Sequence, residues 1–270
     1  MSGPVARLRV AAGQAEAVCG DVAANVETAA ALTAMAAEAG VRLLVLPEAF
    51  LTGYCEQVFA GPLPTPASVA GALEPVARAA AAGVTVVVST PLDRGSRRTL
   101  SSVVVRPDGG VVDAYDKQHL AGYENDHFTA GTHGASLVVD GWQWGMSICY
   151  DGCFPEHARA AADAGAHGYL NSAAFFPGGQ HRRDLYYPSR ALDNGFFVIS
   201  SMLTGRCGQE RFIGGSAVYE PEGRPLARRG DGDGLAVADL DLALIAATRE
   251  RHPMHADHRS SLGERVVIHG

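Results

Sequence analysis

Three side chains that can take part in chemistry stand at the ends of predicted strands. Glu48 lies just past an apolar run over 41–46, Lys117 ends the second strand of a predicted hairpin, and Cys149 follows an apolar strand. A partly desolvated carboxylate can act as a general base, and a thiolate is a nucleophile. Read one at a time, each has an ordinary alternative: a loop carboxylate, a lysine that is present by chance or a small buried side chain.

Lys117 stands apart because arginine supplies almost all of the positive charge. The chain has 22 lysine and arginine residues, and Lys117 is the only lysine among them. An ammonium is a compact point charge, whereas a guanidinium is a planar fork, so the two groups are not interchangeable. We therefore expect Lys117 to do something that arginine cannot, and we expect an amine-selective reagent to inactivate the protein by modifying it.

The position of Cys149 favours reactivity. It lies between a strand and a helix that is predicted to begin at Pro155, and nucleophiles of α/β hydrolases occupy such junctions. A helix N-terminus lowers the pKa of a nearby thiol, so we expect the thiolate to be favoured. Cys153 follows four residues later, which is not a zinc spacing, and we predict neither a metal nor another cofactor.

The cysteines as a set point to a cellular compartment. They are five, an odd number, and they are widely spread over 270 residues. Such a set does not indicate a disulfide framework and fits a reducing cytoplasm. No signal peptide is evident, and no stretch approaches about 18 uninterrupted apolar residues, so we predict a cytoplasmic protein without a membrane span. The five are Cys19, Cys55, Cys149, Cys153 and Cys207.

Composition and missing motifs exclude several classes of protein. A formal net charge of −7 and a pI near 5.8 argue against a nucleic-acid partner, which selects a basic face. With 47% hydrophobic and 19% charged residues, the chain suits a globular fold. It has no Walker A motif, no dinucleotide fingerprint after a strand and no Gly-x-Ser-x-Gly elbow.

Strand-like and helix-like segments alternate along the chain, with turn residues between them. Buried strands are predicted over 41–46, 84–90, 167–172, 196–202 and 235–241. Helices are predicted over 22–39, 65–83, 155–165, 183–194 and 241–250. Hairpins are predicted over 100–116, 136–148 and 212–227. Without a linker or a change in composition, this pattern predicts one α/β domain over residues 1–270, its sheets covered by helices.

The segments around the three strand ends resemble motifs of the nitrilase superfamily, the carbon–nitrogen hydrolases. LPEAFLTGY (46–54) is similar to that family's Glu segment, YDKQHL (115–120) to its Lys segment, and SICYDGCFPE (147–156) to its Cys segment. YENDHFTAG (123–131) resembles its second-Glu loop. Each motif is weak alone, but their order is specific, and the resemblance covers nearly the whole chain. It implies a single-domain α-β-β-α sandwich with two central sheets covered by helices.

The resemblance also implies a mechanism. Glu48 would take the proton of the Cys149 thiol, and the thiolate would attack an amide carbonyl. The Lys117 ammonium and the backbone N–H of Tyr150 would stabilise the oxyanion, each donor being worth about 3 kcal/mol. A thioester would remain, and water activated by Glu48 would hydrolyse it. Glu124 would bind Lys117 or the substrate.

Loops at the strand ends supply aromatic candidates for the substrate pocket, with core packing as the alternative for each. These candidates are Tyr54, Tyr123, Phe175 and Phe176. The expected partner is a small-molecule amide, and neither a nucleic acid nor a membrane is expected. The resemblance implies a homodimer or a larger homo-oligomer.

Residues at the nucleophile indicate the branch of the superfamily. True nitrilases show Cys-Trp-Glu, whereas this chain has Cys149-Tyr150-Asp151, which resembles the amidase and carbamoylase branches. Hydrolysis of a small linear amide leads, and N-carbamoyl amide cleavage comes second. A nitrilase, an acyltransferase and a non-catalytic interaction protein on the same scaffold are the remaining alternatives. Cys153 and Asp193 depart from the family's usual Arg and Glu, which puts local salt bridges in question.

Overall fold

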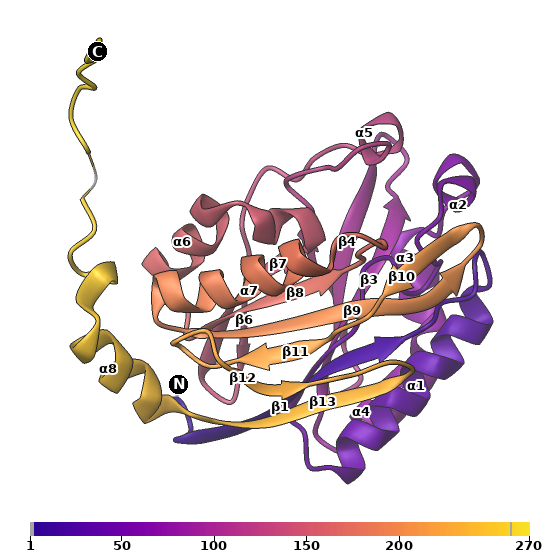
Figure 1. Cartoon of the computed structure of the whole chain (residues 1–270). Coiled ribbons are helices and arrows are strands. Elements are labelled where there is room, and N and C mark those ends of the chain that lie inside the picture. The colour runs from indigo at the N-terminus through magenta and orange to yellow at the C-terminus, as the bar shows by residue number, and fades with distance from the viewer. Residues whose placement is uncertain (1–2, 260) are drawn as a thin grey trace.

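A long, curled sheet runs through the molecule (Figure 1). The structure is a computed structural model, and within the residues it describes, 3–259 and 261–270, thirteen strands join this sheet. The order along its main path is β5-β4-β3-β2-β1-β9-β8-β7-β6. Its two halves meet where the ends of β1 (Arg7–Ala15) and β9 (Phe197–Cys207) pair in parallel.

Helices cover the outer face of each half. The first half contains β1, β2 (Leu43–Val45), β3 (Thr85–Asp93), β4 (Arg98–Val105), β5 (Val111–Asp116) and β13 (Gly234–Asp241). It packs against α1 (Val22–Glu38), α3 (Pro66–Ala72) and α4 (Glu74–Ala80). The second half contains β9, β6 (Ser136–Val139), β7 (Trp142–Ile148), β8 (Gly168–Ala173), β11 (Ala217–Tyr219) and β12 (Pro225–Arg228). It packs against α6 (Pro155–Asp163) and α7 (Gln180–Asn194).

A third apolar layer lies between the two halves. It joins side chains of β1 and β2 to those of β7, β8 and β9, and the stacked rings of Trp142 and Trp144 belong to it. Alternate residues of β1 face this layer and the helices, since Val10 packs inward and Ala11 outward. The predicted α-β-β-α sandwich is therefore confirmed, and the two predicted sheets are the two halves of one hydrogen-bonded sheet.

Strand direction brings the three candidate residues to one edge. β2, β1, β9, β8 and β7 run parallel through successive pairings. β5 is antiparallel to β4, which is antiparallel to β3, so β5 runs the same way as β2. Because the carboxyl ends of such strands meet at one edge, the residues that follow β2, β5 and β7 converge there.

Most predicted elements are present, with three differences. The predicted helix over 65–83 is two helices, α3 and α4. The second begins at Glu74 and has a proline in its first turn. Because proline has no backbone N–H to donate to a preceding turn, it separates the two helices. The central strand β1 was not predicted. In the 212–227 region, β10 (Glu210–Ile213) pairs back onto β9, and only β11 and β12 form a hairpin.

The remaining helices are short or peripheral. They are α2 (Glu56–Ala60), α5 (Glu124–His127), α8 (Leu242–Arg251) and the 3₁₀ turns η1 (Cys149–Cys153) and η2 (Pro253–His255). None of the helices within the described ranges has both the length and the apolar character needed to cross a bilayer.

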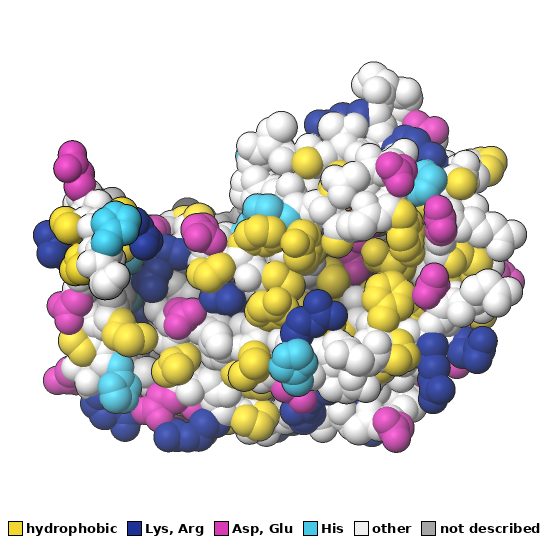
Figure 2. Space-filling view, turned by 45° about the horizontal axis from the view of Figure 1, so that its top comes forward, with side chains coloured by type: hydrophobic (Ala, Val, Ile, Leu, Met, Phe, Trp, Pro, Cys, Tyr) yellow, Lys and Arg dark blue, Asp and Glu magenta, His cyan; other side chains and the backbone are white. Residues whose placement is uncertain are grey.

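Charge on the surface comes from arginine and acidic side chains. Figure 2 shows apolar side chains gathered in the middle of one face, with charged ones around them. Lys117 is 1% exposed, so the basic side chains at this surface are arginines. The only lysine is thus buried and not a solvated surface cation, which is uncommon for this residue type and argues against its presence by chance.

The cysteine prediction was wrong in one respect. Cys19 and Cys55 form a disulfide, although 36 residues separate them in the sequence. The loop after β1 lies against the loop after β2, where the N–H of Gly20 donates to the carbonyl of Thr52, and this brings the two Cα atoms to 6.6 Å. The spacing of the two cysteines along the chain could not reveal this approach. It arises because β1 and β2 are parallel neighbours, so the loops that follow them lie side by side.

Candidate active site

Lys117 lies between two carboxylates in the interior. Its Nζ donates to Glu48 Oε1 at 2.7 Å and to both oxygens of Glu124 at 2.7 and 2.8 Å. All three side chains are almost fully buried. A single cation shared by two buried acids is a costly arrangement unless every charge is paired, so the three groups hold one another in place.

Cys149 stands at the expected junction in a constrained backbone. It directly follows β7 and begins η1, and its φ of 42° lies in the left-handed region that non-glycine residues rarely adopt. Ala49, next to Glu48, has a similar φ of 48°. Such conformations cluster at functional sites, where the surrounding structure must hold them. The Sγ atom lies 3.6 Å from the carbonyl oxygen of Ala174.

Burial at Cys149 acts against the thiolate, whereas the sequence led us to expect that a helix terminus would favour it. Burial raises the pKa of the thiol well above the usual value, the negative charge of Glu48 raises it further, and Lys117 lowers it only in part. Only the short turn η1 follows the residue, so a helix terminus does not offset desolvation. A thiol with a raised pKa needs a base nearby if it is to act as a nucleophile.

Glu48 has the properties of that base. Burial raises the pKa of Glu48 to about 7, with Lys117 and the Cys149 thiol acting in the opposite direction. Among the described residues, its second oxygen, Oε2, has no partner in full hydrogen-bond geometry. A carboxylate whose pKa lies near neutrality, with one free oxygen beside a thiol, is suited to exchange protons with that thiol.

Lys117 stays charged. Burial lowers its pKa, but the two carboxylates outweigh that effect, and its pKa is raised above the ordinary value. The site thus keeps a point cation at neutral pH. An ammonium in this position is suited to stabilise negative charge that develops on a neighbouring oxygen.

Glu124 is fixed from two other sides. The hydroxyl of Tyr54 donates to its Oε1 at 2.6 Å, and the N–H of Ala121 donates to its Oε2 at 2.7 Å. Tyr54 comes from the loop after β2, whereas Ala121 and Glu124 come from the segment after β5. Glu124 therefore joins two loops and orients Lys117, as expected from the sequence.

Asp151 is a positioning residue that the sequence reasoning missed. It is fully buried and accepts hydrogen bonds from the N–H of Ile148 at 3.0 Å and the hydroxyl of Tyr115 at 2.7 Å. It also accepts two bonds from His119, two residues after Lys117. Asp151 thereby ties the Lys segment to the Cys segment. A buried acid so soon after the nucleophile was the available signal.

The predicted pocket aromatics divide into two groups. Tyr54, Tyr123 and Phe176 lie together, with ring centroids 6.0 and 5.9 Å from Tyr54. Phe175 is buried and packs on Tyr187 in the core below α7, which matches the ordinary alternative. Phe212, which was not predicted, joins the first group at 6.0 Å from Tyr54 and 5.2 Å from Phe176.

The side chain of Tyr150 packs outside the charged centre. It is partly exposed, and its ring lies edge-on to Phe154 at 4.9 Å. Only its backbone N–H, the next amide after Cys149, is a candidate for the oxyanion role.

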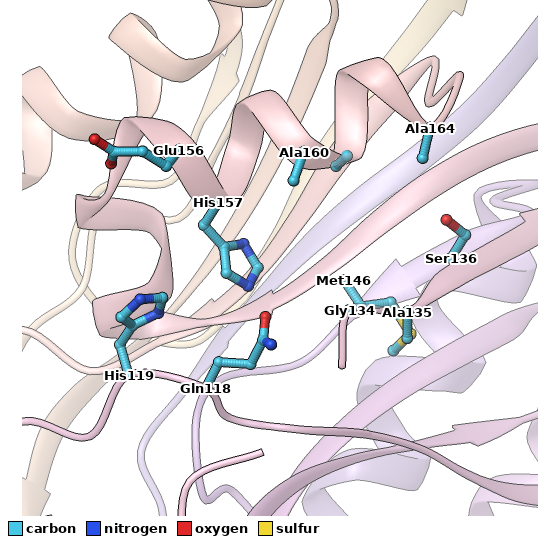
Figure 3. A pocket seen from close by; sticks show the side chains of 11 residues that line it. Gln118, His119, Gly134, Ala135, Ser136, Met146, Glu156, His157, Ala160 and Ala164 are labelled. Atoms are coloured by element: carbon cyan, nitrogen blue, oxygen red, sulfur yellow. The ribbon is translucent and has the colours of Figure 1, made fainter. Parts of the chain in front are cut away.

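A separate hollow of about 450 Å³ lies beside this site (Figure 3). Gln118, His119 and His157 line it, together with small residues of α6. His119, Asp151 and His157 are close enough for a metal ion. However, His157 already bonds to the Tyr169 hydroxyl through Nδ1 and to the Tyr115 hydroxyl through Nε2, so the cluster is a satisfied hydrogen-bond network.

The two departures from the family pattern have local solutions. Asp193 accepts a hydrogen bond from Arg190 at 3.0 Å, so the shorter acid still reaches a cation. Arg190 also donates to the carbonyl oxygen of Gly152 and thereby supports the turn after Cys149. Cys153 is a free thiol, and burial raises its pKa to about 11.

Comparison with known proteins decides the family. The model of the carbon-nitrogen hydrolase family matches residues 9–250. The chain belongs to the carbon–nitrogen hydrolases. Its fold and its relatives place it in the amidase-like branch of the nitrilase superfamily, as the motifs indicated.

Three relatives illustrate this placement. This carbon–nitrogen hydrolase is 33% identical over 247 residues to a hydrolase in the pqqF 5′ region of Pseudomonas protegens, which covers 90% of this chain and 86% of that protein. It is 30% identical over 255 residues to an (R)-stereoselective amidase of a Pseudomonas species, covering 93% and 91%. A double mutant of the amidase from Nesterenkonia sp. AN1, solved in complex with acrylamide, has a TM-score of 0.84 at 29% identity, covering 96% and 97%.

Proposed function

We propose that this enzyme hydrolyses the C–N bond of a small linear amide with Glu48, Lys117 and Cys149 as its catalytic residues. One observation carries the proposal: the only lysine of the chain lies buried between Glu48 and a second acid, at the strand edge that also holds the thiol. This combination supplies a base, a fixed cation and a nucleophile in one place.

The first step is attack on the amide carbonyl. Because the pKa of the Cys149 thiol is raised, the proton passes to Glu48 as the sulfur bonds to the carbonyl carbon. The carbonyl oxygen takes the displaced electron pair. The Lys117 ammonium and the N–H of Tyr150 stabilise this oxyanion, and each such donor is worth about 3 kcal/mol.

Collapse of the oxyanion breaks the C–N bond. The leaving amine takes the proton held by Glu48, and a thioester remains on Cys149. Glu48, again a carboxylate, then takes a proton from water as the water attacks the thioester. The second oxyanion collapses, the C–S bond breaks, and Glu48 returns its proton to the Cys149 sulfur, so the acid product leaves and the thiol is restored. Glu124 takes no proton in this cycle and holds Lys117 in position.

The substrate is a small amide with a short acyl group. The aromatic group of Tyr54, Tyr123 and Phe176 stands next to the charged centre, where Tyr54 donates to Glu124, and supplies apolar surface against which a short acyl group can pack. A double mutant of the Nesterenkonia amidase that resembles this enzyme was solved in complex with acrylamide, an amide of that size. We extend the proposal to residues 1–270 acting as one catalytic domain, as a homo-oligomer, in the cytoplasm.

An ammonia-release screen tests this function. The panel holds aliphatic amides, N-carbamoyl compounds and nitriles, with the Cys149→Ala variant as the blank. We expect release from short amides that the variant does not support. Release from N-carbamoyl compounds alone would favour the carbamoylase alternative, and release from nitriles alone would contradict the amidase proposal. Preferential transfer of the acyl group to an added amine, in competition with water, would indicate an acyltransferase.

A further inference from the structure

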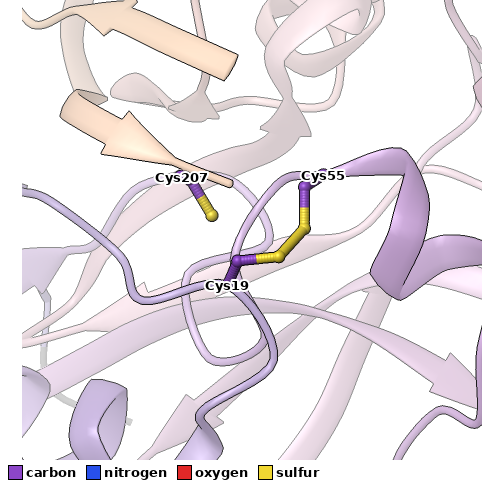
Figure 4. Close-up of side chains that lie close together, drawn as sticks. All are labelled: Cys19, Cys55 and Cys207. Carbon is purple, nitrogen blue, oxygen red and sulfur yellow. A yellow bond between two sulfur atoms is a disulfide. The ribbon is translucent and has the colours of Figure 1, made fainter. Parts of the chain in front are cut away.

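Three sulfur atoms meet beside the loop that carries Tyr54. Cys19 and Cys55 form a disulfide, and Cys207, at the end of β9, is a free thiol. Figure 4 shows the Cys207 sulfur beside the disulfide, and the three sulfur atoms all lie within 4.8 Å of one another. We call Cys19, Cys55 and Cys207 the three-sulfur site.

The backbone around this site is shaped to admit the third sulfur. A Cβ atom at Gly53 would lie 2.5 Å from the Sγ of Cys207, and one at Gly208 would lie 3.4 Å from the Sγ of Cys19. Both glycines have positive φ, 79° and 60°, so another residue would be strained there. A disulfide that only braces two loops does not need a thiol packed against it.

One of the three cysteines is accessible from outside. Cys19 is partly exposed, whereas Cys55 and Cys207 are buried. A cavity of about 290 Å³ opens beside Cys19. It is lined by Gly20, Thr52, Gln57, Val58 and Pro62 among others. No cation or carboxylate belongs to the lining residues, so a small neutral or weakly charged molecule can approach the Cys19 sulfur.

We propose that the three-sulfur site performs thiol–disulfide exchange with a low-molecular-weight thiol or disulfide that enters beside Cys19. The incoming thiolate attacks the Cys19 sulfur, a mixed disulfide forms, and the Cys19–Cys55 bond breaks. The electron pair leaves on Cys55, which takes up the proton that the incoming thiol lost. Attack by a second thiolate on the mixed disulfide releases a small-molecule disulfide, and two electrons have then passed to the protein.

Cys207 offers the mixed disulfide another outcome. Its sulfur attacks Cys19, the bond between Cys19 and the small molecule breaks, and the proton of Cys207 passes to the departing sulfur, so that the small thiol leaves. The product is a Cys19–Cys207 disulfide and a Cys55 thiol, with no net oxidation. Burial raises the pKa of Cys207 to about 11, which keeps this sulfur protonated at rest and favours the Cys19–Cys55 pairing.

The site is connected to catalysis through Tyr54. Cys55 is the next residue, and Gly53, on the other side of Tyr54, approaches the Cys207 sulfur so closely that a Cβ atom there would lie 2.5 Å from it. Tyr54 in turn donates to Glu124, which holds Lys117. A change in the disulfide partner of Cys55 thus acts on the loop that carries Tyr54, and the side chain of Tyr54 helps to orient the catalytic cation. We expect the disulfide state to change turnover more than substrate binding.

Disulfide mapping tests the exchange without reference to activity. The Cys149→Ala/Cys153→Ser protein retains only the three-sulfur site, and glutathione at set ratios of thiol to disulfide is the probe. We expect one free thiol per chain under oxidising conditions and three under reducing conditions. Adding Cys55→Ser should yield a Cys19–Cys207 disulfide, identified by peptide mass spectrometry. Adding Cys19→Ser should abolish the rapid reaction with glutathione.

Several results would overturn the proposal. One is a persistent glutathione adduct on Cys19 in the Cys55→Ser protein, because Cys207 would then fail to displace it. Another is a Cys19–Cys55 bond that glutathione does not reduce in the folded protein. A third is a reduced protein that binds one equivalent of added Zn²⁺ and no longer reoxidises, which would indicate a metal site.

Turnover measurements test the connection to Tyr54, and this arm alone rests on the proposed amidase function. With the Cys153→Ser protein as control, we expect kcat to fall about three- to tenfold on reduction, with KM little changed, as for one loosened hydrogen bond to a charged group. The Cys55→Ser protein should show the lower kcat at every ratio. A kcat that does not respond to reduction would contradict the connection.

Discussion

His119 donates two hydrogen bonds to Asp151, from its backbone N–H at 2.8 Å and from its ring Nδ1 at 2.9 Å. His119 belongs to the segment after β5, and Asp151 belongs to the turn after β7. This contact fixes the position of the segment after β5 relative to the turn after β7. The distance between the Lys117 cation and the Cys149 sulfur therefore depends on a carboxylate that takes no part in the chemistry.

Asp151→Asn tests this positioning role. The amide keeps the shape but replaces one acceptor oxygen with a donor, and a buried donor then faces the donors that Asp151 satisfied. We expect a loss of about 2–4 kcal/mol in unfolding free energy and a fall in kcat larger than the change in KM. Urea unfolding and steady-state ammonia release measure the two effects. Asp163→Asn, at an exposed acid paired with His255, is the control and should be nearly silent.

Lys117→Arg tests the need for a point cation. The positive charge is kept, so both acids remain paired and the protein should fold. The planar guanidinium is larger and its charge is spread, so it cannot hold Glu48 and face an oxyanion in the same way. We expect kcat to fall by about 10²–10³-fold, the usual effect of removing one oxyanion donor. Turnover near that of the wild type, with an unchanged circular dichroism spectrum, would sink the role of Lys117.

We expect the pKa of Glu48 to set the acid limb of activity, because the proposed mechanism uses this residue as the general base. A general base works as the carboxylate, and protonation removes it. Because the pKa of Glu48 is raised to about 7, kcat/KM should fall as pH drops through about 7, and tenfold for each further pH unit. An ordinary glutamate would retain activity down to about pH 5. His119→Gln should keep the same midpoint, and loss of the limb in that variant would assign it to the histidine.

The charged centre was accessible from the sequence because it depends on residue type and strand order. Glu48, Lys117 and Cys149 each end a strand, and parallel strands bring their ends together without any knowledge of distances. The network around Asp151 was less accessible. His119, Tyr115 and Asp151 are unremarkable until the fold brings them together, and only the burial of an acid marks the place.

The errors have a common physical origin. The expected thiolate at Cys149 followed from a local rule about helix termini, whereas the actual pKa depends on desolvation by the whole fold. The disulfide between Cys19 and Cys55 was missed because loops of neighbouring strands approach through tertiary structure. Phe175 was a pocket candidate with core packing as its alternative, and its ring packs in the core. In each case the sequence indicates the local segment, whereas the surroundings that decide its behaviour form only in the folded protein.

The burial of Lys117 reverses one expectation from composition. A single lysine suggested that an amine-selective reagent would inactivate the enzyme. However, the Nζ atom is enclosed, paired with two carboxylates, and its pKa is raised, so the neutral amine that such reagents require is almost absent. We now expect the folded protein to be modified only at its N-terminus and to keep its activity. Intact-protein mass spectrometry should show one added group per chain.

Unfolding supplies the comparison that makes this result informative. In guanidinium chloride, Lys117 loses its carboxylate partners and its pKa returns towards 10.4, the value of an exposed lysine. A second group should then add, and peptide mapping should place it on Lys117. The prediction is contradicted if the folded enzyme takes up a second label on Lys117 and loses activity in parallel. That result would mean that the Lys117 site opens to solvent far more often than its buried ion pairs imply. Protection by a substrate amide would locate that opening at the catalytic centre.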